Sequence, residues 1–175
     1  MAEVLAKNNN QSFRLVQITD SHLFADRTTI FDGLNTFDTL VDVVDLVNKN
    51  ENNIDCLLCT GDIAQDSSLD AYKNFLTALT PFDAPQLWIP GNHDIRGNMQ
   101  QVLDKDSISL KRTVQLGDWR IIMLDSSVEG KVYGLLDQKE LADLDLELAD
   151  SERNNCHVLV CVHHNCMPVN AAWLQ

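Results

Sequence analysis

Three short motifs that combine carboxylate, imidazole and amide side chains follow one another along this chain. They are Asp20-Ser21-His22, Gly61-Asp62 and Gly91-Asn92-His93-Asp94. Carboxylate oxygens and neutral imidazole nitrogens are suitable ligands for divalent ions such as manganese, iron(II) and zinc. Each motif alone is common, and the third also describes an ordinary turn, since Gly, Asn and Asp are turn formers. Their order and their helix-length spacing together predict a metal site.

Each motif directly follows an apolar run that predicts a buried β-strand. The runs are residues 13–19, 56–60 and 86–90. In an open α/β sheet, ligands bind outside the carboxyl ends of the strands. We therefore expect all three motifs at one edge of one sheet.

Helices are expected between these strands. Residues 36–48 repeat apolar side chains every three or four positions, which is the period of an amphipathic helix. Ser67 or Ser68 can cap a second helix that stops before Pro81, and a shorter helix should follow the third motif. The alternation of strands and helices predicts an α/β fold.

The second half of the chain continues this pattern. Residues 119–124 predict a strand, and residues 137–149 predict an acidic amphipathic helix with Leu141, Leu144 and Leu148 facing inward. Residues 157–162 predict a further strand that delivers His163 and His164 at its end. We expect a single domain over residues 13–175, preceded by a disordered polar tail over residues 1–12.

The composition limits the classes of partner. The net charge is −13, with 26 acidic against 13 basic residues, and such a surface repels nucleic acid and anionic membranes. A bound divalent ion reverses this for a small phosphoester, because it is the largest local charge in its site. Five cysteines without disulfide-type spacing indicate a reducing cytoplasm, and Cys56 and Cys59 are expected to be structural residues inside a strand.

The residues around the motifs resemble a known family. They are Thr-Gly-Asp-Ile-Ala-Gln-Asp at 60–66, Trp-Ile-Pro-Gly-Asn-His-Asp at 88–94, Leu-Asp-Ser at 124–126 and the histidine pair at 163–164. The chain resembles the calcineurin-like metallophosphoesterases and, more narrowly, the bacterial class III 3′,5′-cyclic AMP phosphodiesterases. The resemblance implies a β-sandwich flanked by helices, with the C-terminal part missing. It also implies hydrolysis of cyclic AMP to 5′-AMP at a centre of two divalent ions, which are iron(II) or manganese, with zinc and magnesium as alternatives.

The resemblance assigns a ligand role to each matching position. Asp20 and His22 would bind the first ion, Asp62 would bridge both ions, and Asn92 and His163 would bind the second. The family places a proline two residues after its histidine ligand, whereas this chain has Asn165 or Cys166 in that region, so His164 stays open as the alternative.

The resemblance also implies the substrate contacts. His93 would contact the phosphate and donate a proton to the leaving oxygen, a task that suits a side chain with an ordinary pKa of about 6.5. His22, Asp62 and Asn92 would bind the substrate together with His93. Family members carry a later Gly-His-x-His motif with two more ligands, and this sequence has none, so we expect a truncated form with impaired activity.

Two alternatives remain open at the level of sequence. The same site could hydrolyse another phosphodiester or a phosphomonoester, such as a glycerophosphodiester or a nucleotide. The fold could also serve as a non-catalytic scaffold, although a scaffold would not need the proton donor His93.

Overall fold

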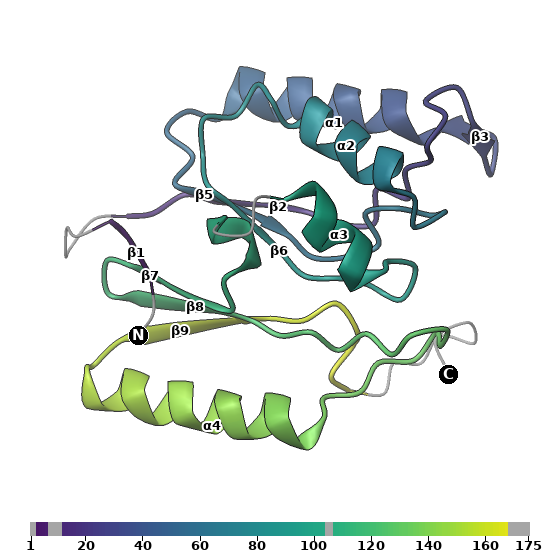
Figure 1. Ribbon diagram of the computed structural model, residues 1–175. Coiled ribbons are helices and arrows are strands. Elements are labelled where there is room, and N and C mark those ends of the chain that lie inside the picture. The colour runs from purple at the N-terminus through teal and green to yellow at the C-terminus, as the bar shows by residue number, and fades with distance from the viewer. Residues whose placement is uncertain (1–2, 7–11, 104–106, 168–175) are drawn as a thin grey trace.

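The computed structural model of the chain describes residues 3–6, 12–103 and 107–167. Two β-sheets face each other, with α1 and α2 on the outer side of one sheet and α4 on the outer side of the other (Figure 1). The strands are β1 (Glu3–Ala6), β2 (Leu15–Ile18), β3 (Ile30–Phe31), β4 (Leu34–Asn35), β5 (Cys56–Cys59), β6 (Gln86–Trp88), β7 (Thr113–Leu116), β8 (Trp119–Met123) and β9 (His157–Cys161). The helices are α1 (Thr36–Asn50), α2 (Leu69–Ala78), α3 (Arg96–Val102), the 3₁₀ helix η1 (Ile108–Leu110) and α4 (Gln138–Arg153). The predicted α/β class and helix-flanked sandwich are confirmed.

The first sheet is the one that the motifs predict. Its order is β2-β5-β6, and both pairings are parallel. The three strands therefore end at the same edge, and each is followed there by one motif. The expectation of one sheet edge that collects all three motifs is confirmed.

Strand β5 is at the centre of this sheet and is buried on both faces. Because successive side chains of a strand point to opposite faces, Leu57 and Cys59 pack toward the helices, whereas Cys56 and Leu58 pack between the sheets. All five cysteines of the sequence are free, and burial raises the pKa of the Cys56 thiol to about 12. This agrees with a structural interpretation of the Cys56-x-x-Cys59 spacing.

The helices over the first sheet begin at capping residues that the sequence displays. The Asn35 side chain accepts a hydrogen bond from the backbone N–H of Asp38 at the start of α1, and the Ser68 side chain accepts from Ala71 at the start of α2. Such caps satisfy N–H groups that have no partner within the helix. Tyr72 and Phe75 on α2 are fully buried against the sheet.

The second sheet has the order β1-β7-β8-β9. Strand β1 pairs in parallel with β7, so the prediction of a disordered tail is wrong for Glu3–Ala6. The polar residues around β1 obscured a short edge strand whose partner lies more than 100 residues away. Residues 1–2 and 7–11 of the expected tail lie outside the described part of the chain.

Ion pairs join helix α4 to the second sheet, and of the three leucines predicted to face inward only Leu144 is partly buried. Leu141 and Leu148 are each 39% exposed. Arg112 contacts Glu140 and Asp143 at 2.7 and 3.0 Å. The buried Arg120 contacts Glu147 and Asp150, which lie about one and two turns beyond Asp143 on the helix. Among the described helices, none is long and apolar enough to cross a membrane.

Candidate metal centre

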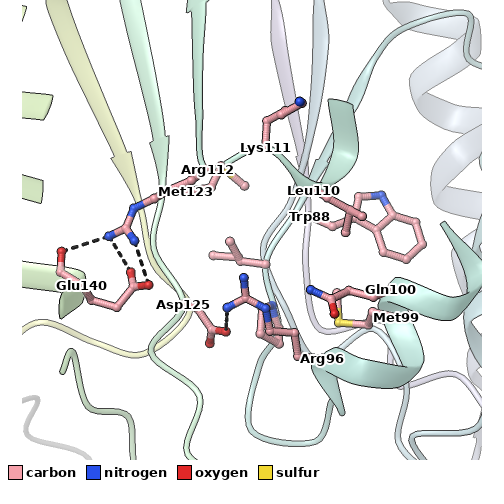
Figure 2. A pocket seen from close by; sticks show the side chains of 12 residues that line it. Trp88, Arg96, Met99, Gln100, Leu110, Lys111, Arg112, Met123, Asp125 and Glu140 are labelled. Carbon is pink, nitrogen blue, oxygen red and sulfur yellow. Dashed lines mark hydrogen bonds and ion pairs between the residues drawn. The ribbon is translucent and has the colours of Figure 1, made fainter. Parts of the chain in front are cut away.

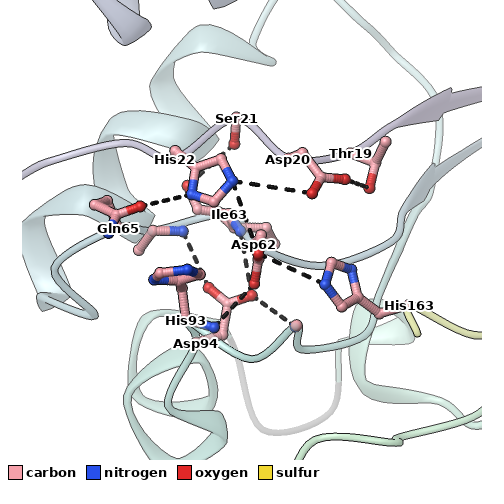
Figure 3. A network of polar contacts seen from close by, with 12 residues as sticks. Thr19, Asp20, Ser21, His22, Asp62, Ile63, Gln65, His93, Asp94 and His163 are labelled. Atoms are coloured by element: carbon pink, nitrogen blue, oxygen red, sulfur yellow. Dashed lines mark hydrogen bonds and ion pairs between the residues drawn. The ribbon is translucent and has the colours of Figure 1, made fainter. Parts of the chain in front are cut away.

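The three motifs meet at the carboxyl edge of the first sheet, where hydrogen bonds join their loops (Figure 3). The backbone N–H of Asp20 donates to the Gly61 carbonyl at 3.0 Å, and that of His22 donates to the Asp62 carbonyl at 2.9 Å. The loops after β2 and β5 are thus extensions of their parallel pairing. This keeps the side chains of the first two motifs side by side.

The backbone conformation at these positions is unusual. Asp20, His22 and Asp62 have φ angles of 56°, 44° and 48°. Left-handed conformations are uncommon for residues other than glycine and cost about 1–3 kcal/mol each at strained sites. They persist only where the surrounding structure requires them, which is typical of functional sites.

Two glycines allow the backbone of one loop to touch the side chains of another. A Cβ atom on Gly61 would lie 2.6 Å from Nδ1 of His163, and a Cβ on Gly91 would lie 2.2 Å from Oδ1 of Asp62. Gly61 also has a φ of 103°, which other residues rarely adopt. The glycines of the second and third motifs are therefore needed for packing around Asp62 and His163.

Two groups of three side chains could each hold an ion, and they share Asp62. The groups are His22, Asp62 and His93, and Asp20, Asp62 and His163, with ligand atoms within 4.8 Å of one another. The Nε2 atoms of His22 and His163 lie 3.7 and 3.6 Å from Oδ2 of Asp62. Two ligands of one ion with bonds of about 2.1 Å cannot be more than about 4.2 Å apart. These spacings fit ions on both sides of Asp62.

The grouping differs in part from the predicted one. Asp20 is grouped with His163, although its Oδ1 is also 3.9 Å from Nε2 of His22, its predicted partner. His93, predicted as a proton donor, stands close enough to His22 and Asp62 to act as a ligand. Asn92 is partly buried in the same loop, next to His93, and its role as a ligand stays a prediction.

Hydrogen bonds orient the two histidines that face Asp62. Nδ1 of His22 is 2.7 Å from the side-chain oxygen of Gln65, and Nδ1 of His163 is 2.9 Å from the Thr60 carbonyl. Because a carbonyl oxygen only accepts, each Nδ1 carries a hydrogen, and in the neutral ring each Nε2 then keeps its lone pair. Both lone pairs are thus free for a metal, an arrangement typical of histidine ligands.

The charges at the centre reinforce one another. Burial alone would raise the pKa of Asp62, but contacts with His163 and the His93 backbone N–H hold it below its ordinary value. Burial would likewise lower the pKa of His163, but Asp62 and the Thr60 carbonyl raise it above its ordinary value. Asp62 is therefore an ionised carboxylate at neutral pH, as a metal ligand must be.

Asp94 is the structural residue that sequence reasoning left without a role. Its carboxylate accepts hydrogen bonds from the backbone N–H groups of Ile63, Ala64 and Gly91, at 3.1, 3.0 and 2.9 Å. It thereby ties the second and third motifs together (Figure 3). Its place at the end of the third motif was the available signal, but two of its three partners, Ile63 and Ala64, are about 30 residues away along the chain.

Two further carboxylates, those of Asp66 and Asp125, brace the loops around the centre. Asp66 accepts hydrogen bonds from the backbone of Ala25 and Ser68. Asp125, in the loop after β8, contacts Arg96 at 2.7 Å, and the two residues line a pocket that is distinct from the metal-type groups (Figure 2). Arg96 is the first residue of α3, so this ion pair ties the segment after the third motif to the second sheet.

The four histidines near the centre separate into two kinds. His22, His93 and His163 surround Asp62, whereas His164 contacts Ser126 and Val132. Of the two histidines at the end of β9, His163 is the one beside Asp62. The geometry therefore favours His163, and its role as a ligand stays a prediction.

Comparison with known proteins agrees with this geometry. The calcineurin-like phosphoesterase family model matches residues 13–174. The chain is 37% identical over 93% of its length to the 3′,5′-cyclic adenosine monophosphate phosphodiesterase CpdA of Escherichia coli, and 39% identical over 94% to CpdA of Pseudomonas aeruginosa. It is 33% identical over 96% to a 3′,5′-cyclic-nucleotide phosphodiesterase of Nostoc. It spans 58%, 59% and 62% of the lengths of these three relatives. The chain belongs to the calcineurin-like phosphoesterase family.

Proposed function

We propose that residues 13–175 belong to the catalytic domain of a metal-dependent phosphodiesterase that hydrolyses 3′,5′-cyclic AMP to 5′-AMP. The observation that carries the proposal is the pair of three-residue groups that share Asp62. A carboxylate common to two groups is what a bridging ligand between two ions requires. The names of the relatives support the choice of a cyclic nucleotide as the substrate.

The residues at the centre fit two divalent ions. Asp20, His22, Asp62, Asn92 and His163 would hold them through oxygen and imidazole nitrogen atoms, a ligand set that suits iron(II) or manganese, with zinc and magnesium as alternatives. Bound ions of this kind polarise phosphoryl oxygens and supply a nucleophile from water at neutral pH.

His93 is the proposed proton donor to the leaving oxygen. Its backbone is held from two sides, because its N–H donates to Oδ1 of Asp62 at 2.9 Å and its carbonyl accepts from the Ser67 hydroxyl at 2.5 Å. Its ring meets the His22 ring edge-on, with 5.1 Å between centroids. A partly buried imidazole held in this way can protonate an oxygen that departs beside Asp62.

The surroundings favour a small anionic ester. A hollow of about 410 Å³ borders Asp20 and His22, which is within the size range of small-molecule sites. The net charge of −13 disfavours nucleic acid and membrane partners. We therefore propose a diffusible nucleotide substrate in the cytoplasm.

The test is metal content and cyclic AMP hydrolysis with Mn²⁺, compared between the wild-type chain and Asp62→Asn. Loss of a residue that only supports a metal ligand typically costs about 10- to 100-fold in metal affinity or activity. Asp62 is itself a proposed ligand of both ions, so Asp62→Asn should lower the metal affinity by more than this and release both ions. Asp42→Asn is the matched control, because Asp42 is an exposed residue on α1. Unchanged metal content in Asp62→Asn would contradict the proposal.

The substrate is tested separately. Cyclic AMP, glycerophosphoethanolamine and p-nitrophenyl phosphate are compared with the same metal-loaded chain. A preference for cyclic AMP supports the proposal. A preference for either of the other two esters assigns the site to a different phosphoesterase reaction. Two bound ions with no hydrolysis of any ester would favour a scaffold.

A further inference from the structure

The loop that follows β8 encloses the histidine next to the candidate ligand. We call residues 124–136 the strap. It begins where the Leu124 N–H donates to the Cys161 carbonyl at 2.9 Å, beside the end of β9. It closes on itself where the Leu135 N–H donates to the Ser126 carbonyl at 2.9 Å. The strap is thus a closed loop attached to the strand that delivers His163 and His164.

Both ring nitrogens of His164 are engaged by the strap. Nδ1 lies 2.7 Å from the Ser126 hydroxyl and Nε2 lies 3.2 Å from the Val132 carbonyl. A carbonyl oxygen only accepts, so Nε2 carries the hydrogen, and Nδ1 then accepts from the Ser126 hydroxyl. Ser126 is 2% exposed, so water does not compete for this hydrogen bond.

A glycine allows the strap to lie directly against this ring. A Cβ atom on Gly134 would be 2.3 Å from Cγ of His164, far inside any normal contact. The ring is therefore held by two hydrogen bonds and by the backbone at Gly134. None of the described candidate ligands takes part in holding this ring. The function proposed above therefore gives the enclosure of His164 no role.

The enclosed ring is in direct contact with the candidate ligand. The His163 and His164 rings meet edge to face, with 5.0 Å between centroids and 88° between planes. His163 donates from Nδ1 to the Thr60 carbonyl and turns Nε2 toward Asp62. The two neighbouring histidines thus carry opposite tautomers, and neither nitrogen of His164 is free for an ion.

We propose that His164 is a positioning residue, which the strap holds through Ser126, Val132 and Gly134 so that Nε2 of His163 stays directed at Asp62. The inference rests on the metal site proposed above and adds a part of the second sheet to it. Its physical basis is that a ligand held in place before the ion arrives loses less conformational freedom on binding. Residues that orient a ligand typically change metal affinity by about 10- to 100-fold.

The first test reads the tautomers of the wild-type chain directly. Two-bond ¹H–¹⁵N correlation spectra of the metal-free chain, at about pH 8.5 and thus above the ordinary histidine pKa of about 6.5, distinguish the two neutral forms. The sequence has only five histidines, so each can be assigned by substitution. His164 in the Nε2–H form and His163 in the Nδ1–H form are expected. An Nδ1–H form of His164 in the wild-type spectrum would overturn the inference.

The second test measures Mn²⁺ affinity from the electron paramagnetic resonance signal of the free ion. Ser126→Ala removes the hydroxyl that bonds His164 and should weaken the binding of one Mn²⁺ by about 10- to 100-fold. Ser127→Ala is the matched control, because the Ser127 hydroxyl bonds Asp125 at 2.6 Å in the same strap and should leave the affinity within about twofold.

The two proposals fail in different ways. Equal Mn²⁺ affinity of Ser126→Ala and Ser127→Ala, with a wild-type chain that binds Mn²⁺, refutes the positioning role alone. A wild-type chain that binds no Mn²⁺ refutes the proposed function. A loss of affinity in Ser126→Ala at unchanged thermal unfolding in EDTA is the supporting result, since a merely structural effect would lower the unfolding temperature instead.

Discussion

Asp94 should be the residue whose loss most damages the metal centre without removing a ligand. Its side chain is 9% exposed and accepts three backbone N–H groups, two from the loop after β5 and one from Gly91. Asp94→Ala leaves all three donors without this partner. A buried donor without a partner costs about 1–3 kcal/mol. Three such donors would cost about 3 kcal/mol even at the lower limit.

The charge of Asp94 reduces this cost. Burial raises the pKa of Asp94 above its ordinary value, and the negative charge of Asp62 adds to this, although the three N–H groups act in the opposite direction. A raised pKa in the folded state means that the contribution of Asp94 is fully present below the unfolded pKa and is partly lost as the pH rises through the folded pKa. Asp94→Asn keeps one oxygen and removes the charge, so we expect a loss of only about 1–2 kcal/mol at neutral pH. The loss should grow toward acid pH.

The assay is urea unfolding followed by circular dichroism in EDTA, with Mn²⁺ affinity measured in parallel. The expected order of stability is wild type, then Asp94→Asn, then Asp94→Ala. Asp42→Ala, on the exposed face of α1, is the control and should stay within about 0.5 kcal/mol of wild type. Equal unfolding midpoints for Asp94→Ala and Asp42→Ala would refute the view that Asp94 ties the two loops together.

Two further substitutions test the packing of the site and of the second sheet. Gly91→Ala should cost about 1–3 kcal/mol and weaken Mn²⁺ binding, because its Cβ would lie 2.2 Å from Oδ1 of Asp62. Gly97→Ala is the control, because a Cβ at this position on α3 would have open space around it, and it should be neutral or stabilising by up to about 1 kcal/mol in urea unfolding. A smaller loss of stability for Gly91→Ala than for Gly97→Ala would contradict the close approach of Gly91 to Asp62. Arg120→Leu should cost about 2 kcal/mol, because the side chain is only 9% exposed and pairs with two carboxylates on α4 that can regain water only in part. Arg153→Leu is the control and should cost less than about 0.5 kcal/mol, because the Arg153 side chain is 71% exposed. Equal losses of stability at both arginines would show that ion pairs do not attach α4 to the second sheet.

Local sequence patterns determined the elements of this protein and the place of its motifs. The apolar runs before Asp20, Asp62 and Asn92 became three parallel strands of one sheet. Ser68, one of the two caps considered for the second helix, begins α2, and the apolar period over residues 36–48 located α1. Such signals lie within a few residues of the feature that they specify, so periodicity and capping are sufficient to identify them.

The same patterns did not predict which face of a helix packs against the sheet where both faces of that helix remain partly solvated. The leucine spacing of α4 predicted a buried apolar face, but only Leu144 is partly buried, whereas Leu141 and Leu148 are exposed. Arg112 and Arg120 instead pair with carboxylates of this helix. A leucine stripe and an acidic stripe are both present on this helix. Which one faces the sheet depends on what the sheet offers, and here it offers arginines.

Only the tertiary structure decided how the side chains of the centre are grouped. Asp20 joined His163, and His93 joined His22. The distinction between His163 and His164 depended on a hydrogen bond to Thr60, 103 residues earlier, and on Ser126, 38 residues earlier. The sequence determined that these residue types end their strands, because strand and loop propensities are local. It could not determine which ring faces Asp62, because that choice belongs to contacts that exist only after the two sheets have packed together.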